Sequence, residues 1–198
     1  MRTEPYDNKD GRKCWLSRDE TEMLLKKASD DGIEHEIALS LGVRCGMRAS
    51  EIITVMPRNI DEHDQVGARL EIEGDVAKSD RPREVPLPME LKYAIRAHTD
   101  DHAPDEPIVS VTTTKTIERW VERAAERCQA ETGNSRWRFV EPHDLRRTWG
   151  TQLVEQEVEP GLIMEWGGWE DWKTFRKHYL GAYSPEMERK QIEKVRWL

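Results

Sequence analysis

Apolar residues recur at helical spacing along most of the chain, and at every second position in one short stretch. The helical stretches carry start and stop signals, such as the Ser17 to Glu20 capping box and a terminal Gly133. These signals predict helices over 18–25, 37–41, 47–53, 89–95, 117–128, 142–155 and 172–179, with further helices starting at 160 and 185. Most of the fold is therefore expected to be helical.

The one stretch with a period of two begins at Gly67. Ala68, Leu70 and Ile72 alternate with charged residues, and a second extended run covers 83–87. The two runs predict a β-hairpin, whose long polar connection holds Lys78 and Arg81. The expected fold class is α+β, mainly α: a helical domain with one small antiparallel β-sheet.

The first residues of the chain show neither period. Residues 1–14 are mostly polar and include Pro and Gly, which predicts a flexible lead-in or the remnant of a linker. Residues 15–198 are expected to form a single domain, because they contain no internal repeat and no compositional break.

The charge balance argues at first against a nucleic-acid partner. The chain has 39 acidic residues against 31 Lys and Arg, a net charge of −8. However, arginine outnumbers lysine, the acidic residues are spread over the whole length, and the mean hydropathy is −0.84. This surface is typical of proteins that work in concentrated salt, where the Debye length falls to roughly 3 Å at about 1 M. An ordinary acidic cytosolic protein is the alternative interpretation.

Cysteine usage and targeting signals indicate the compartment. Cys14, Cys45 and Cys128 are far apart, odd in number and without zinc-binding spacing, so reduced thiols and no metal are expected. The sequence shows no signal peptide and no apolar run of membrane length. These features predict a cytoplasmic protein.

Candidate chemistry begins at Pro142, where a helix is predicted to start. His143 and Arg146, three residues apart, share one face of that helix close to its N-terminus. Free N–H groups and the helix dipole favour an anion there, and a phosphate is the natural candidate. An exposed charged helix with a surface histidine would show the same spacing.

Further motifs lie in order around this pair. Arg48 stands in Cys45-Gly46-Met47-Arg48-Ala49-Ser50-Glu51, Lys78 precedes the second strand, and Gly168-Trp169 is followed by Tyr179. Together with His143-x-x-Arg146, this order resembles the catalytic domain of the tyrosine recombinase (phage integrase) family. The resemblance covers nearly all of the chain from about Trp15.

The resemblance implies a mechanism for cutting DNA without metal or cofactor. Tyr179 would attack the scissile phosphate, with His143 as the base. Arg48 and Arg146 would hold the non-bridging oxygens, because guanidinium donors match phosphate. Lys78 would give a proton to the leaving 5′-oxygen, while Trp169 would pack or donate through its indole N–H. Glu51 is expected to orient Arg48 or the helix around it.

Two departures from the family pattern leave alternatives open. Tyr179 follows Trp169 one residue later than is common in the family, so His178 occupies the expected register and Tyr183 is the second candidate nucleophile. Arg81 is close enough to replace Lys78. The N-terminal domain that closes a clamp around DNA in the family is expected to be absent here, which fits a truncated chain or a minimal member.

The resulting hypothesis is a site-specific recombinase or integrase of a haloarchaeon, or of its virus or plasmid. Its partner would be double-stranded DNA, on which it would form a homo-tetramer through a C-terminal helix docked onto a neighbouring subunit, or remain a monomer alone. The competing hypotheses are a catalytically inactive DNA-binding relative and a type IB topoisomerase.

Overall fold

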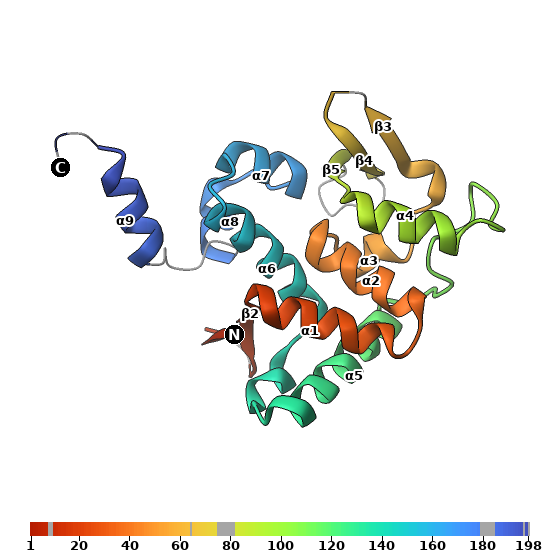
Figure 1. Cartoon of the computed structure of the whole chain (residues 1–198), viewed down its shortest axis with the longest axis horizontal. Helices are drawn as coiled ribbons and strands as arrows, with labels where there is room; N and C mark the ends of the chain where they lie inside the picture. Colours follow the sequence, from red (N-terminus) through yellow and green to blue (C-terminus); the bar gives the residue numbers. More distant parts are fainter. Residues whose placement is uncertain (8–9, 64, 75–81, 179–184, 196, 198) are drawn as a thin grey trace.

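The computed structural model describes residues 1–7, 10–63, 65–74, 82–178, 185–195 and 197. The elements in chain order are β1 (Arg2–Pro5), β2 (Arg12–Trp15), α1 (Arg18–Ser29), α2 (Ile33–Arg44), α3 (Ala49–Ile52), η1 (Pro57–Asn59), β3 (Ile60–His63), β4 (Gly67–Ile72), β5 (Arg83–Pro86), α4 (Met89–His98), α5 (Thr114–Thr132), η3 (Ser135–Phe139), α6 (Pro142–Glu155), α7 (Pro160–Gly167), α8 (Trp172–His178) and α9 (Pro185–Glu193). The mainly helical α+β prediction is confirmed (Figure 1).

The predicted helix signals act as expected. The Ser17 hydroxyl accepts from the Glu20 N–H at 3.3 Å, and the Glu20 carboxylate accepts from the Ser17 N–H at 2.9 Å, so the capping box starts α1. Gly133 ends α5 in the left-handed conformation, at φ +68°. Ile117, Val121, Ala124, Ala125 and Cys128 on one face of α5 are buried in the main core, and Trp120 packs against that core partly buried.

The main core and a smaller cluster meet along α6. Leu145 belongs to the main core, which also receives side chains from α1, α2, α4, α5 and the sheet. Trp149 and Val154, further along the same helix, join Ile163, Trp169 and Phe175 in the second cluster. The helix that carries the His-x-x-Arg motif therefore connects the two clusters.

The predicted hairpin is part of a larger sheet. Strand β4 pairs antiparallel with β5, with Leu70 opposite Val85, as the alternation predicts. On its other edge, β4 also pairs with β3, which the sequence did not predict. Strand β3 has only one apolar residue, Ile60, so it carries no alternating signal.

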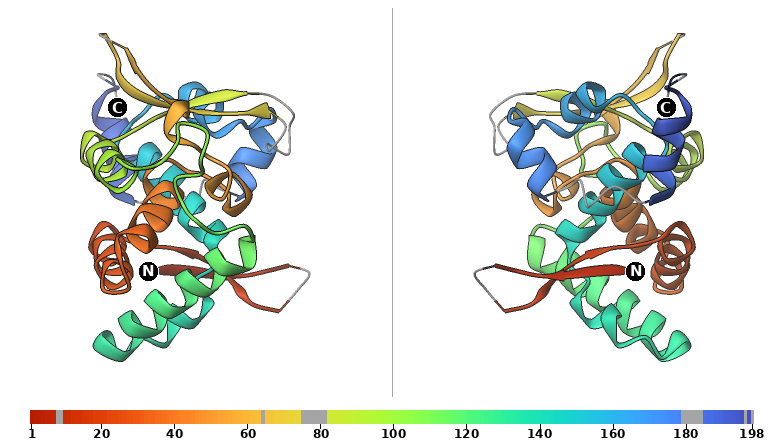
Figure 2. Two further views of the ribbon diagram at one scale, coloured as in Figure 1. Left: turned by 90° about the vertical axis from the view of Figure 1, so that its right-hand side faces the viewer. Right: turned by 90° about the vertical axis from the view of Figure 1, so that its left-hand side faces the viewer.

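The N-terminal segment is not the unstructured lead-in that its composition predicts. Strands β1 and β2 form a second antiparallel sheet, so the described residues contain two small sheets and not one. The backbone N–H of Cys14 donates to Asp144 at 3.0 Å, and that of Leu16 donates to Thr148 Oγ1 at 3.0 Å. The anchors lie on α6, about 130 positions away, so no local pattern could reveal them. Figure 2 shows α2 and α6 between this hairpin and the three-stranded sheet.

Asp144 is the main anchor of the hairpin. Its carboxylate is fully buried and also accepts from the Glu141 N–H at 2.9 Å and from the Arg147 guanidinium. Burial raises the pKa of Asp144 to about 6, against the opposing effects of Arg147 and the two backbone donors. The group is thus ionised at neutral pH and paired with Arg147.

Two further expectations concern reduced cysteines and the absence of a membrane-spanning segment. All three cysteines are free and buried, and burial raises the pKa of each thiol to about 12. They are therefore thiols, not thiolates, at neutral pH. Among the helices that the structure describes, none is long and apolar enough to cross a membrane.

Replacing Asp144 with Ala tests this anchor. The change removes the acceptor of two backbone donors and leaves the Arg147 guanidinium buried without its carboxylate, so we expect the free energy of unfolding to fall by about 3–5 kcal/mol. Urea unfolding at neutral pH measures the loss. Asp105→Ala, at an exposed aspartate in a loop, is the control and should change stability little; equal effects of the two variants would contradict the anchoring role.

Candidate active site

The buried carboxylate of Glu51 organises the candidate site. Arg48, at the N-cap of α3, donates to it twice: its Nη1 to Oε1 at 2.6 Å and its backbone N–H to Oε2 at 2.7 Å. The side chain of Arg48 is 21% exposed, whereas that of Glu51 has no exposure. The expectation that Glu51 orients Arg48 agrees with these contacts.

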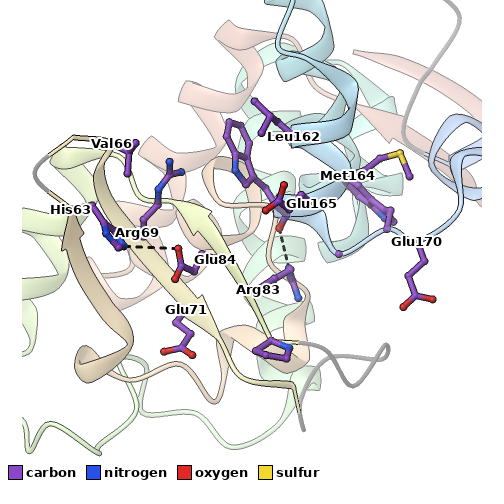
Figure 3. Close-up of a pocket in the computed structure, with 14 residues that line it drawn as sticks. His63, Val66, Arg69, Glu71, Arg83, Glu84, Leu162, Met164, Glu165 and Glu170 are labelled. Carbon is purple, nitrogen blue, oxygen red and sulfur yellow. Dashed lines mark hydrogen bonds and ion pairs between the residues drawn. The ribbon is translucent and has the colours of Figure 1, made fainter.

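Arg83 completes the contacts of the same carboxylate. From the start of β5 its Nη1 donates to Glu51 Oε1 at 2.9 Å and its Nη2 to Oε2 at 2.7 Å. Its Nε donates to the Trp166 carbonyl at 3.0 Å, and Figure 3 shows this side chain reaching from the strand toward α7. One arginine thereby connects β5, α3 and α7.

The charges around Glu51 keep it ionised. Burial alone would raise its pKa, but the hydrogen bonds and charge of Arg83 and the charges of Arg146 and Arg48 outweigh burial, so the pKa lies below its usual value of 4.5. Three guanidiniums thus surround one carboxylate, and the cluster as a whole is positively charged.

Arg146 lies deeper than the sequence suggested. It is fully buried, and its two Nη atoms donate to the carbonyls of Gly46 and Gly167. Its guanidinium carbon lies 4.4 Å from the centre of a Trp169 ring. Arg146 therefore joins the turn that precedes Arg48 to the C-terminal end of α7.

His143 lies in a different setting from Arg146. Together with Arg48 it lines a cavity of about 680 Å³, which is also lined by Arg138 and by carboxylates from α5 and Glu141. The structure therefore brings Arg48 and His143 together at one cavity. Sequence spacing predicted one shared target for His143 and Arg146, but Arg146 is not among the described residues that line this cavity.

Trp169 packs inside the protein. It is 8% exposed, and its ring lies 4.7 Å from that of Phe175 and 5.8 Å from that of Trp149, between ring centroids. It also borders a second cavity of about 1100 Å³ between the three-stranded sheet and α7, where Arg69 and Trp166 lie (Figure 3). Arg83 lines this second cavity and Arg48 lines the first, so the Glu51 cluster lies between the two cavities.

Several predicted residues cannot be placed. Lys78, its alternative Arg81, and both candidate nucleophiles, Tyr179 and Tyr183, lie outside the described residues. Their roles stay predictions from the sequence.

Arg83 is the functional candidate that the sequence prediction missed, although a signal was present. In the period of two, Arg83 shares a face with Val85 and Leu87, both of which are buried. A charged residue on the core face of a strand requires a buried partner of opposite charge. Glu51 on α3 is that partner in the structure, and no local pattern in the sequence identifies it.

Comparisons with known proteins identify the family and the fold. The sequence profile of the Phage integrase family matches residues 14–184, so the chain belongs to that family. The tyrosine recombinase XerA of Pyrococcus furiosus is 26% identical over 153 residues, which cover 76% of this chain and 51% of XerA. The chain thus spans about half the length of this relative.

Solved structures show the same fold at low identity. A crystal structure of XerA recombinase superposes with a TM-score of 0.71 and 19% identity, covering 92% of this chain and 65% of that one. A structure of the Tn1549 transposon integrase with transposon right end DNA gives a TM-score of 0.70 and 15% identity, covering 96% and 68%.

Replacing Gly46 with Ala tests whether the Trp149 ring requires glycine in the turn before Arg48. Gly46 has φ +65°, and a Cβ there would lie 2.3 Å from the Trp149 ring, whereas a Cβ at Gly133, at φ +68°, would meet no atom within 4 Å. Gly46→Ala should therefore cost more than the roughly 1 kcal/mol of backbone strain expected for Gly133→Ala. Urea unfolding of both variants measures the difference, and equal losses would show that the ring contact does not constrain Gly46.

Glu51→Gln tests the buried carboxylate through its pH dependence. The pKa of Glu51 in the folded chain is below 4.5, so between that pKa and pH 4.5 the unfolded chain binds more protons than the folded chain. The stabilisation by ionised Glu51 is therefore complete above about pH 4.5 and is lost as the pH falls through the folded pKa. The variant should be less stable by about 3 kcal/mol at neutral pH, and the gap should close in acid.

Urea unfolding from neutral pH down to about pH 3 provides the measurement. The exposed Glu126→Gln on α5 serves as the control. A gap for Glu51→Gln that does not depend on pH would show that its charge does not contribute.

Proposed function

We propose that this chain cuts and rejoins DNA strands in site-specific recombination, through a 3′-phosphotyrosine intermediate and without metal. The observation that carries the proposal is that Arg48, held by Glu51, and His143 line one cavity in an integrase fold. A guanidinium and an imidazole at one concave surface suit a phosphodiester and a group that must lose its proton.

In the proposed reaction the Tyr179 phenol passes its proton to His143 and its oxygen attacks the phosphorus. A phosphorus to Tyr179 oxygen bond forms as the bond to the 5′-oxygen breaks, and Lys78 supplies the proton to that leaving oxygen. The reverse steps, with a 5′-hydroxyl as the attacking group, rejoin a strand. The intermediate retains a phosphodiester bond, so no external energy source is required.

Arginine side chains carry the charge of the transition state in this proposal. Arg48, which is partly exposed at the cavity, is assigned to one non-bridging oxygen. The resemblance assigns Arg146 to the other, which requires this fully buried side chain to exchange its carbonyl partners for the phosphate when DNA binds. Trp169 packs against the guanidinium of Arg146 and keeps water away from it.

Double-stranded DNA is the proposed partner; in support, the structurally similar Tn1549 transposon integrase is in complex with transposon right end DNA. We further propose a tetramer on DNA in which α9 docks onto a neighbouring subunit. In support, α9 lies at one edge of the molecule (Figure 1). The ion pair of Lys194, just after α9, with Glu157 of the same chain at 2.6 Å favours the monomer instead. A monomer is the alternative for the free protein.

The acidic surface supports a proposed working environment of concentrated salt, as in a haloarchaeal cytoplasm. A net charge of −8 repels DNA at low ionic strength, and salt screens that repulsion. The three free cysteines fit a reducing compartment.

Covalent capture on randomised DNA tests the proposed function and selects the DNA site in the same step. The chain is incubated with a pool of randomised duplexes, each nicked near its centre, in low salt and in molar KCl. Adducts that survive denaturation are isolated and sequenced. We expect adducts on a shared sequence, because loss of the short fragment beyond the nick prevents rejoining, and we expect Tyr179→Phe to abolish them.

The variants separate the alternatives. If Tyr183→Phe alone abolished the adduct, Tyr183 would be the nucleophile. Sequence-specific binding with no adduct in either salt would indicate an inactive DNA-binding relative. Relaxation of supercoiled plasmid by a monomer, without sequence preference, would indicate a type IB topoisomerase.

A further inference from the structure

The two oxygens of Glu51 receive four hydrogen bonds, two from Arg48 and two from Arg83. An ionised carboxylate offers about four lone-pair positions, so these four donors occupy the whole carboxylate. The parallel pair of bonds from Arg83 fixes the plane of the carboxylate. The direction of Arg48 therefore depends on Arg83, although the two arginines belong to different elements.

The charge balance of the cluster gives a second reason why Arg48 depends on Arg83. Arg48 and Glu51 alone would form a neutral pair, with little attraction left for a phosphate. Arg83 adds a second guanidinium to the same carboxylate, so the three groups together carry one positive charge. Arg146, from α6, adds another nearby. Arg83 thus offsets the neutralisation of Arg48 by its own partner.

Arg83 itself is poorly placed to touch DNA. Its side chain is 4% exposed and its Nε is bound to the Trp166 carbonyl. The Cδ of Arg83 also packs closely over Gly168, where a Cβ would lie 3.0 Å away. Such a residue can act on a substrate only through its neighbours.

We propose that Arg83 is a positioning residue that orients Arg48 through Glu51 and keeps the cluster positively charged. This inference rests on the proposed function and extends it to a residue that does not contact the phosphate.

Two substitutions separate orientation from charge. Arg83→Met removes both, whereas Arg83→Lys keeps the charge and loses the paired hydrogen bonds. Adduct formation, measured per folded molecule on a duplex recovered from the randomised pool, should slow by about 100-fold in both variants, since small misplacements of a catalytic group have effects of this size. Arg127→Met is the matched control: Arg127 pairs with Asp31 at 2.6 Å between α5 and α1, and its loss should leave the rate unchanged.

A double-mutant cycle tests whether Arg83 acts through Glu51. If it does, Arg83→Met should slow the reaction far less in a Glu51→Gln background than in the wild type. Equal slowing in both backgrounds would overturn the proposal, because Arg83 would then act by another route. An unchanged rate in Arg83→Lys would also overturn it. If Arg83→Met does not fold, Arg83→Lys in the same two backgrounds supplies the cycle.

DNA affinity gives a readout that does not depend on cleavage. The affinity of each variant for the randomised duplex pool is measured over a range of KCl concentrations. Arg83→Met should bind more weakly and with a salt dependence lower by about one released ion, whereas Arg83→Lys and Arg127→Met should keep the wild-type slope. An unchanged slope in Arg83→Met would overturn the charge role.

The pH dependence of unfolding tests the same link. Glu51 faces Arg48 from its own helix, Arg83 from β5 and Arg146 from α6, and the loss of Arg83 should raise the pH at which the stabilisation by ionised Glu51 is lost. If wild-type protein formed no adduct, the proposed function would fail, while the salt slopes would still decide the role of Arg83.

Discussion

One buried carboxylate sets the arrangement on which the candidate site depends. Glu51 is inside the protein and ionised, a state that is unfavourable unless every oxygen lone pair meets a donor. The donors come from α3 itself and from β5, so the sheet and the short helix can pack only where Arg83 and Arg48 reach the same group. The N-cap position of Arg48 and the start of β5 are thereby fixed relative to each other.

Buried hydrogen bonds also fix the position of helix α6. Near its start, Asp144 and Thr148 accept from the backbone of β2 and of the residue after it. Arg146, between them in the sequence, donates to the carbonyls of Gly46 and Gly167. Glycine at 46 and 167 leaves room for the Trp149 and Trp169 rings beside those carbonyls. Buried polar contacts therefore fix the helix, and apolar packing surrounds them.

The sequence predicted the parts of this arrangement whose information is local. Capping at Ser17, the αL end at Gly133 and the alternation through Leu70 each lie within a few residues, and the Arg48 to Glu51 contact spans a single turn. The N-terminal hairpin, strand β3 and the partner of Arg83 depend on contacts between distant segments. Spacing placed Arg146 beside His143, but only the three-dimensional packing shows that Arg146 points inward.

The proposed function requires an acidic chain to bind a polyanion, and the same cluster would supply the local positive charge for it. Three guanidiniums against one carboxylate leave two positive charges at a buried point, while the excess of acidic residues is spread along the chain. Salt screens exposed charges over distances beyond the Debye length but acts much less on buried ones. Concentrated salt would therefore weaken the repulsion of DNA by the surface more than the attraction of a phosphate by the cluster, so the net charge of the chain is a poor guide to its partner.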